Sequence, residues 1–421
     1  MSFPTDPFAR VGRALSDSSL LKCQGLTEGR WQSAPSGSTF PVYEPASGAV
    51  LVYCSNFSRH DIQRAILSAN AGQKKFYTST TAAQRGKPLR AWYGLILANK
   101  EDLATILTLE NVKVIAEARS EVEYAASFVS WFAEEATRSY GDVIPPSTPG
   151  ATIFTLKEPV GVCGIITPWN FPAAMITRKV APALAAECSV IIKPPSETPF
   201  TALALAQLAV RAGIPAACVQ VVPTKDRTAA SELASNDIIK KLSFTGSTEV
   251  GKYLSTLAAK TVKKMSMELG RNAALIVFDD ANLDKGAMQC KFRATGQTCV
   301  CANRLFVHAS VVDKFARRLT EQASQLKLGF GLEENVTQGP LVNKCSVEKV
   351  ARHVRDALDH EGELLFGGNR PSHLGNGYFF EPTIIKNATT DMASGFGTEG
   401  DKYGLEEYQV IKSVTIGSME A

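Results

Sequence analysis

The turn that contains Cys299 has the composition expected around a reactive thiol. A Gly-Gln-Thr sequence at 296–298 precedes Cys299, and such small and polar residues leave a side chain accessible. Neighbouring backbone amides could stabilise a thiolate there, which would make Cys299 a nucleophile. The alternative is a small buried hydrophobic residue, the role that fits Cys163, Cys188 and Cys218.

Cys299 and Cys301 also form a C-x-C pair. A zinc site would need a second pair or a nearby histidine, and neither is present, so we expect no metal. A disulfide between the two cysteines would close a small strained ring that is easily reduced. Reversible oxidative inactivation is therefore one hypothesis for Cys301, and a packed cysteine is the other.

A second candidate for chemistry is the glycine-containing segment 246–252, GSTEVGK. Its spacing matches a phosphate-binding loop, but Tyr253 stands where the magnesium-binding hydroxyl should be, which argues against a nucleotide triphosphatase. Gly246 and Ser247 still begin an expected helix, and the free amides of a helix N-terminus favour an anion such as a pyrophosphate. The alternative is an ordinary strand-to-helix turn.

Alternating strands and helices must position these residues. We expect strands at 160–166, 190–193, 219–222, 242–245 and 265–269, and helices at 171–186, 201–212 and 247–259. This alternation predicts βαβ units and hence a doubly wound parallel sheet. Ligands of such sheets bind beyond the carboxyl ends of the strands.

The flanking segments complete the expected organisation. Residues 61–136 have helical periodicity, and the proline- and glycine-rich stretch 141–150 predicts a turn-rich crossing. A second α/β lobe is expected to begin near Asn272. Its expected strands are 273–278 and 305–308, and its expected helices are 285–295 and 311–326.

Length and composition limit the class of protein. The 421 residues exceed one ordinary core, so we expect two or three lobes. A net charge of +4 without a basic stripe argues against nucleic-acid binding. The apolar stretch 202–210 is too short to span a bilayer, and the N-terminus lacks a signal-peptide core, so we expect no membrane partner. Nine scattered cysteines are typical of reduced cytoplasmic thiols.

Several motifs resemble the aldehyde dehydrogenase superfamily, and they occur in the order found there. They are the stretches 167–172 (TPWNFP), 193–196 (KPPS), 244–247 (FTGS), 268–270 (ELG) and 296–299 (GQTC). The resemblance extends from about Gly48 to the C-terminus. Stretches 175–179, 291–293 and 296–304 are most similar to the succinate-semialdehyde dehydrogenases of this superfamily.

The resemblance implies an α/β fold with a doubly wound parallel-sheet cofactor domain, a second α/β catalytic domain and a small β oligomerisation extension. The NAD(P)-binding domain would comprise 1–140 and 159–269, and the catalytic domain 270–392. The extension would comprise 141–158 and 393–421. The resemblance also implies a homodimer or homotetramer.

The activity implied is oxidation of succinic semialdehyde to succinate, as in 4-aminobutyrate degradation. Cys299 would attack the aldehyde to form a thiohemiacetal. The Asn170 side chain and the Cys299 amide would stabilise its oxyanion, and loss of one such donor typically costs about 2.7–4 kcal/mol. After hydride transfer leaves a thioester, Glu268 would activate water as the general base.

The cofactor implied is NADP or NAD. Lys193, at a strand end, can reach the adenosine ribose. The third residue after it is acidic in many relatives restricted to NAD and repels a 2′-phosphate, whereas here it is Ser196, followed by Glu197. We therefore expect NADP to be accepted. The resemblance assigns further cofactor contacts to Thr167, Trp169, Asn170, Gly246, Ser247 and Leu269.

Two arginines indicate the substrate. Arginine binds a carboxylate through a planar, two-pronged set of donors, and Arg178 and Arg293 could both face one tunnel. In the related enzymes these positions bind the substrate carboxylate. A small aldehyde with a distal carboxylate is therefore the expected partner, although a lone arginine is commonly only a solvated charge.

Three departures support a second hypothesis, a catalytically impaired or silent relative or a dehydrogenase of another aldehyde. Arg271 replaces the second glycine of Glu-Leu-Gly-Gly, which costs on the order of 1–3 kcal/mol if that φ is positive. The helix after Asp284 is shorter by roughly 3–4 residues. After Met392, a segment of the catalytic lobe is missing before Ala393, and we expect poor solubility or near inactivity.

Overall fold

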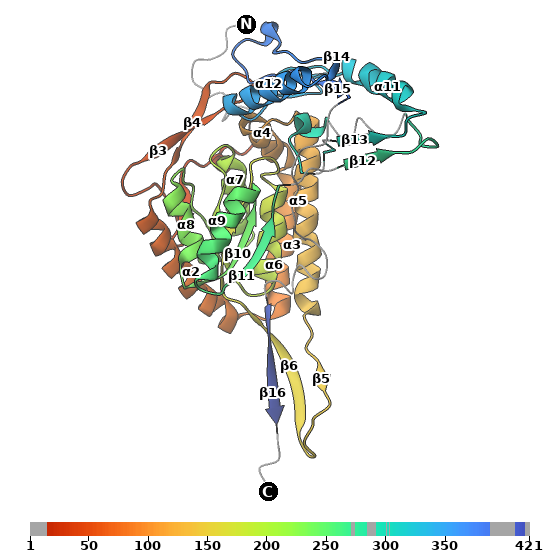
Figure 1. Ribbon diagram of the computed structural model, residues 1–421. Coiled ribbons are helices and arrows are strands. Elements are labelled where there is room, and N and C mark those ends of the chain that lie inside the picture. The colour runs from red at the N-terminus through yellow and green to blue at the C-terminus, as the bar shows by residue number, and fades with distance from the viewer. Residues whose placement is uncertain are drawn as a thin grey trace.

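The computed structural model describes residues 15–270, 274–283, 292–299, 301–302, 304–387 and 409–416. Within them lie two α/β lobes and a narrow β extension (Figure 1). The first lobe comprises a seven-stranded sheet and the helices that cover it. The second lobe comprises two two-stranded sheets with two long helices.

The seven-stranded sheet has a parallel centre and an antiparallel edge. Its order is β11 (Lys264–Glu268), β10 (Ile239–Thr245), β7 (Val162–Ile166), β8 (Ser189–Lys193), β9 (Val219–Val221), β1 (Gly25–Thr27) and β2 (Arg30–Gln32). The first five strands are parallel to one another. Strand β1 is antiparallel to β9, and β2 is antiparallel to β1. The predicted parallel sheet is therefore confirmed, with two antiparallel strands added at one edge.

Helices cover both faces of this sheet (Figure 1). One face packs on α2 (Arg59–Ser79), α8 (Arg227–Ser235) and α9 (Thr248–Ala259). The other packs on α3 (Ala82–Ala98), α4 (Lys100–Glu110), α5 (Ile115–Glu135), α6 (Ala174–Ala185) and α7 (Pro199–Arg211). Successive strand residues serve opposite cores: Ile191 belongs to the first and Ile192 to the second. This is why β7 is buried at every position from Val162 to Ile166.

Two smaller β structures flank this lobe. A hairpin joins β3 (Thr39–Tyr43) to β4 (Val50–Ser55). The extension is a three-stranded antiparallel sheet of β5 (Val143–Ile144), β6 (Thr152–Pro159) and β16 (Gln409–Ile416). It projects from the end of the molecule opposite α12 (Figure 1). Segments far apart in the sequence therefore meet in it.

The second lobe has little sheet. β12 (Ala274–Val277) pairs in parallel with β13 (Arg304–Val307), and β14 (Glu363–Phe366) pairs antiparallel with β15 (Ile384–Lys386). The helices are α11 (Val312–Ser324) and α12 (Lys344–Asp359). Its main core holds few fully buried residues, among them Val277, Phe292, Phe315 and Leu319. Residues Ile276 and Phe278 are 61% and 63% exposed.

The five parallel strands and helices α6, α7 and α9 were predicted to within a few residues, and α8 was not predicted. The helix expected at 285–295 differs from the structure where it can be described. Of the helix expected at 285–295, residues 284–291 lie outside the described part, and Arg293–Gly296 form a short 3-10 helix, η4. Ala294 and Thr295 have φ of 47° and 57°, so the chain there is left-handed and cannot continue an α-helix. Arg271 and the Met392–Ala393 junction also lie outside the described residues.

None of the described helices combines the length and apolarity that crossing a membrane requires.

Candidate active site

The predicted cofactor residues meet at one edge of the large sheet. Because β7, β8, β10 and β11 are parallel, their carboxyl ends open on the same side. The Thr167 amide donates to the Lys193 carbonyl at 3.5 Å, and the Gly246 amide donates to the Glu268 carbonyl at 3.0 Å. Residues that follow four different strands are thereby held as one rim.

The rim offers groups that suit a phosphorylated ligand. Gly246 and Ser247 lead into α9, and the Ser247 hydroxyl accepts from the Val250 amide at 3.4 Å. Among the described residues, the buried hydroxyls of Thr167 and Thr245 have no hydrogen-bond partner. Free helix amides and unsatisfied hydroxyls can accommodate a phosphate-bearing cofactor.

A close helix contact shapes the same rim. A Cβ at Gly251 would lie 2.3 Å from Cδ2 of Leu269, so a larger residue there would displace the Leu269 side chain. Leu269, a predicted cofactor residue, thus packs directly under α9.

Lys193, Ser196 and Glu197 form a polar group after β8. Burial lowers the pKa of Lys193, and the Glu197 carboxylate opposes that shift. The Ser196 hydroxyl donates to Oε2 of Glu197 at 3.1 Å. The Lys193 ammonium and the Ser196 hydroxyl therefore both lie near the Glu197 carboxylate, which accepts the hydrogen bond from Ser196.

The Asn170 side chain contacts the loop at residues 293–299, here called the cysteine loop. Its Nδ2 donates to the Gln297 carbonyl at 3.0 Å, two residues before Cys299. The Cys299 side chain is exposed, whereas Cys301 is buried. The sequence-predicted nucleophile is therefore accessible, and the predicted oxyanion donor is next to its loop.

Gln297 anchors the cysteine loop to the second lobe. Its Oε1 accepts from the Val342 amide at 3.1 Å, and its Nε2 donates to the Pro340 carbonyl at 3.4 Å. Thr295 adds a hydrogen bond from its hydroxyl to the Gly339 carbonyl at 3.1 Å. The loop that carries Cys299 thus touches both lobes.

Cys301 packs inside this loop. The Thr298 hydroxyl donates to the Cys301 sulfur at 2.8 Å, and that thiol faces the Arg293 carbonyl at 3.6 Å. Its side chain is 1% exposed. The oxidative hypothesis for Cys301 stays a prediction.

The two predicted substrate arginines lie against different aromatic rings. The Arg178 guanidinium is 5.3 Å from the ring centre of Phe128 on α5, and that of Arg293 is 5.5 Å from the ring centre of Phe171. Arg178 is half-buried and Arg293 is exposed. A contact of this kind between a guanidinium and an aromatic ring is a cation–π interaction, which orients the side chain.

Glu268 ends β11 and is half-buried. Its backbone joins the rim through Gly246. Glu268 therefore lies at the edge of the sheet where the predicted cofactor residues also lie.

Four residues near the start of α5 also support the site, and the sequence analysis missed them. Asn111, Lys113, Glu117 and Glu121, here called the α5 bracket, hydrogen-bond to the loops that carry Asn170 and Cys299. Glu117 and Glu121 are four apart in α5, so they share one helix face, and Lys113 precedes the helix. Charged residues along a face that also buries Ala118 and Val122 were the signal that could have revealed them.

Comparisons with known proteins agree with this geometry. Residues 31–394 match the family described as "Aldehyde dehydrogenase family". The chain is 50% identical to 3-sulfolactaldehyde dehydrogenase of Pseudomonas putida over 381 residues, which are 90% of this chain and 78% of the relative. It is also 50% identical to succinate-semialdehyde dehydrogenase [NADP(+)] 1 of Schizosaccharomyces pombe over 368 residues, 86% of this chain and 74% of the relative.

Solved structures show the same fold. Succinate-semialdehyde dehydrogenase from Burkholderia pseudomallei superposes with a TM-score of 0.92 at 41% identity, covering 96% of this chain and 100% of the other. Betaine aldehyde dehydrogenase from Staphylococcus aureus, in complex with NAD+, gives 0.92 at 26% identity, covering 99% and 98%.

Proposed function

The chain belongs to the aldehyde dehydrogenase family, and on that premise we propose that it oxidises succinic semialdehyde to succinate with NAD(P) as cofactor. The observation that carries the proposal is the pairing of an exposed Cys299 with the Asn170 carboxamide, which donates to the Gln297 carbonyl within the cysteine loop. A nucleophile beside a neutral hydrogen-bond donor is the minimum that addition to an aldehyde requires.

Cys299 acts as the nucleophile in this proposal. Its thiolate adds to the aldehyde carbon and gives a thiohemiacetal, whose oxyanion receives hydrogen bonds from Asn170 Nδ2 and the Cys299 amide. For this, Asn170 Nδ2 exchanges its bond to the Gln297 carbonyl for one to the substrate oxygen. A bound nicotinamide supplies the acceptor for the hydride that leaves the tetrahedral carbon.

Glu268 acts as the general base. The thioester that remains on Cys299 needs a water molecule deprotonated at its oxygen, and a half-buried carboxylate at the end of β11 suits that task. Attack by this water releases succinate and restores the thiol.

The cofactor proposed is NADP or NAD, with NADP accepted. The residues that would hold it are Thr167, Trp169, Lys193, Ser196, Glu197, Gly246, Ser247 and Leu269. The unsatisfied Thr167 and Thr245 hydroxyls support this placement. Ser196 is neutral, so a 2′-phosphate meets no charge at that position, and the Schizosaccharomyces pombe relative is named for NADP(+).

The substrate class proposed is an aldehyde with a distal anion. Arg178 and Arg293, whose guanidinium groups lie beside the rings of Phe128 and Phe171, would bind the succinic semialdehyde carboxylate. The 50% identity to 3-sulfolactaldehyde dehydrogenase favours a second candidate, because a sulfonate offers the same arginines an equally charged partner.

Weak turnover is part of the proposal. The relatives above are covered over 78% and 74% of their lengths by 90% and 86% of this chain, so part of each relative lies outside the aligned stretch. Residues Ile276, Phe278 and Phe306, at 61%, 63% and 44% exposure, support a lobe deprived of covering strands. The alternative to weak turnover is that this chain is a catalytically silent member of the family.

We also propose a homodimer or homotetramer built through β5, β6 and β16, a cytoplasmic location, and a role in 4-aminobutyrate degradation. Exposed Val143, Ile144 and Leu156 on the extension support the assembly.

The deciding experiment follows reduced cofactor by absorbance, with succinic semialdehyde and with 3-sulfolactaldehyde. We expect slow turnover that Cys299→Ser lowers by at least about 10³-fold. Cys345→Ser is the matched control, because Cys345 is also an exposed thiol but lies on α12. Turnover that survives in Cys299→Ser would contradict the role of Cys299 as nucleophile. Rapid turnover of the parent would contradict the proposal that a missing segment weakens its activity.

A further inference from the structure

The α5 bracket contacts both loops that form the proposed site. Asn111 Nδ2 donates to the Trp169 carbonyl at 2.5 Å. Lys113 Nζ donates to the Asn170 carbonyl, and the Glu117 carboxylate accepts from the Ala294 amide at 2.8 Å. One short stretch of chain thus holds the segment before α6 and the segment before Cys299.

The half of the bracket that faces α6 is fully buried. Lys113 and Glu121 form an ion pair and are at most 1% exposed. The amides of Ala173 and Ala174 stand at the start of α6, where the helix itself provides no acceptor. Both donate to Oε1 of Glu121, at 2.9 and 3.3 Å. Lys113 Nζ lies 3.8 Å from the ring centre of Phe171. The chain on both sides of Asn170 is therefore fixed to α5.

In the half of the bracket that faces Cys299, Glu117 makes the contact: its carboxylate accepts a hydrogen bond from the Ala294 amide. Ala294 is the first of two successive residues in the left-handed conformation. This conformation costs on the order of 1–3 kcal/mol per residue. Burial raises the pKa of Glu117, while the Ala294 amide, Lys113 and Arg293 oppose that rise. A strained turn persists only where its surroundings hold it, and Glu117 supplies that hold.

We propose that Glu117 is a positioning residue for the aldehyde chemistry: it fixes the left-handed turn at Ala294 and thereby sets Cys299 against the Asn170 carboxamide. Glu121 on the same helix and Lys113, which precedes that helix, hold the backbone around Asn170. This inference rests on the proposed role of Cys299.

The test compares Glu117→Leu, which removes the acceptor, with Glu117→Gln, which keeps an acceptor oxygen at the same place. We expect Glu117→Leu to lower kcat by roughly 10–100-fold with an unchanged KM, because misplacement by about 1 Å can cost about 10² in rate. Glu117→Gln should restore kcat to within a few-fold of the parent. Glu123→Leu is the matched control, since Glu123 is an exposed residue of α5 that pairs with Lys100.

Hydrogen exchange provides a readout that does not depend on turnover. The amide of Ala294 should exchange faster in Glu117→Leu and at the parental rate in Glu117→Gln and Glu123→Leu. If Glu117→Leu does not fold, Glu117→Asp replaces it, since a carboxylate one methylene shorter should give a smaller change in the same direction.

The outcomes separate this inference from the proposed function. Unchanged exchange at Ala294, or faster exchange with kcat unchanged, overturns the positioning role. A rise in KM with kcat constant also overturns it, because it indicates a substrate contact. Turnover that does not depend on Cys299 defeats the proposed function, while the exchange result still decides whether Glu117 holds the turn.

Discussion

The two lobes differ in how much of their sheet is covered. In the first lobe five parallel strands lie between two layers of helices, and residues such as Ile191 and Ile192 are at most 1% exposed. In the second lobe the parallel pair β12–β13 leaves Ile276 and Phe278 more than half exposed. Parallel strands are normally buried on both faces, and a two-stranded sheet is at most marginally stable alone. The second lobe must therefore take part of its order from the first.

Contacts between the lobes fit this view. The Ile115 amide at the start of α5 donates to the Gly331 carbonyl at 2.9 Å. A Cβ at Gly339 would lie 1.9 Å from the Val112 carbonyl oxygen, so glycine is required for the approach. The difference teaches that the proposed chemistry is divided: Glu268 ends a strand of the first lobe, whereas Asn170 and Cys299 lie on loops that the α5 bracket holds.

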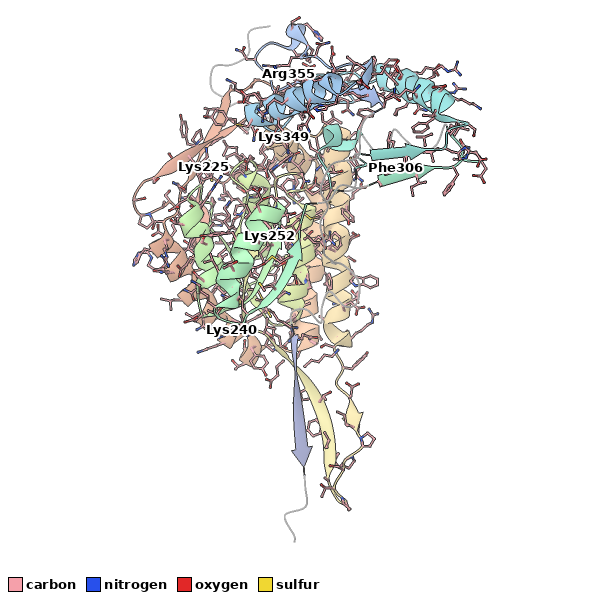
Figure 2. The ribbon with its side chains drawn as sticks, in the orientation of Figure 1. Lys225, Lys240, Lys252, Phe306, Lys349 and Arg355 are labelled. Carbon is pink, nitrogen blue, oxygen red and sulfur yellow. The ribbon has the colours of Figure 1, made fainter. Side chains whose placement is uncertain are left out.

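The strongest test of the contrast is a matched pair of phenylalanine truncations. Phe244 on β10 is 3% exposed. Phe306 on β13, which Figure 2 labels, is 44% exposed. We expect Phe244→Ala to lower the free energy of unfolding by about 3–5 kcal/mol through loss of burial and cavity formation. Phe306→Ala should change it by less than about 1 kcal/mol. Guanidinium unfolding followed by circular dichroism measures both.

The same pair bears on solubility. Replacing an exposed ring should raise the soluble yield of Phe306→Ala, because exposed apolar surface promotes association. Equal losses of stability in the two variants would show that β13 is covered after all, and the contrast between the lobes would fail.

A second test asks whether the second lobe contributes to substrate binding. Arg293→Ala should raise KM for succinic semialdehyde by roughly 10–100-fold, because a charged hydrogen bond to the carboxylate is lost. KM for an uncharged aldehyde should change little. Steady-state kinetics with both aldehydes decides the matter, and equal effects on both would refute the assignment.

The smallest expected effect concerns the first lobe alone. Ser196→Glu should raise KM for NADP several-fold more than KM for NAD, since a carboxylate near a 2′-phosphate adds like-charge repulsion, which is modest where water screens it. Kinetics with both cofactors tests this. A parent enzyme with a strong preference for NAD would contradict the premise that Ser196 admits NADP.

Local pattern was sufficient for the parallel centre of the first lobe and insufficient at its antiparallel edge, at α8 and at the junction with the second lobe. The five parallel strands and helices α6, α7 and α9 follow from apolar runs and helical spacing, since each of these elements carries its own period. The left-handed Ala294 and Thr295 carry no such signature, because neither residue type favours that conformation. Their geometry comes from contacts such as the one with Glu117, which lies far away in the sequence.

The same reasoning applies to the candidate site. Cys299, Asn170 and Glu268 could be proposed because they stand in short recognisable motifs. Lys113 and Glu121 could not, because they look like ordinary helical charges until the fold buries them against the loop at Asn170. A charged residue's partner is a property of the tertiary structure, and local spacing records only its helix face.

The pairing of β16 with β6 has a consequence for how the protein is made on the ribosome. Strand β6 pairs along its whole length with β16, from Pro159 opposite Gln409 to Thr152 opposite Ile416. The N-terminal lobe can fold while synthesis continues, but one edge of β6 must wait until Gln409–Ile416 has been translated. During that interval a nascent chain presents an unpaired strand edge, at which a neighbouring chain on the same messenger could dock. The timing of translation, rather than the stability of the finished sheet, then decides which strand β6 meets first.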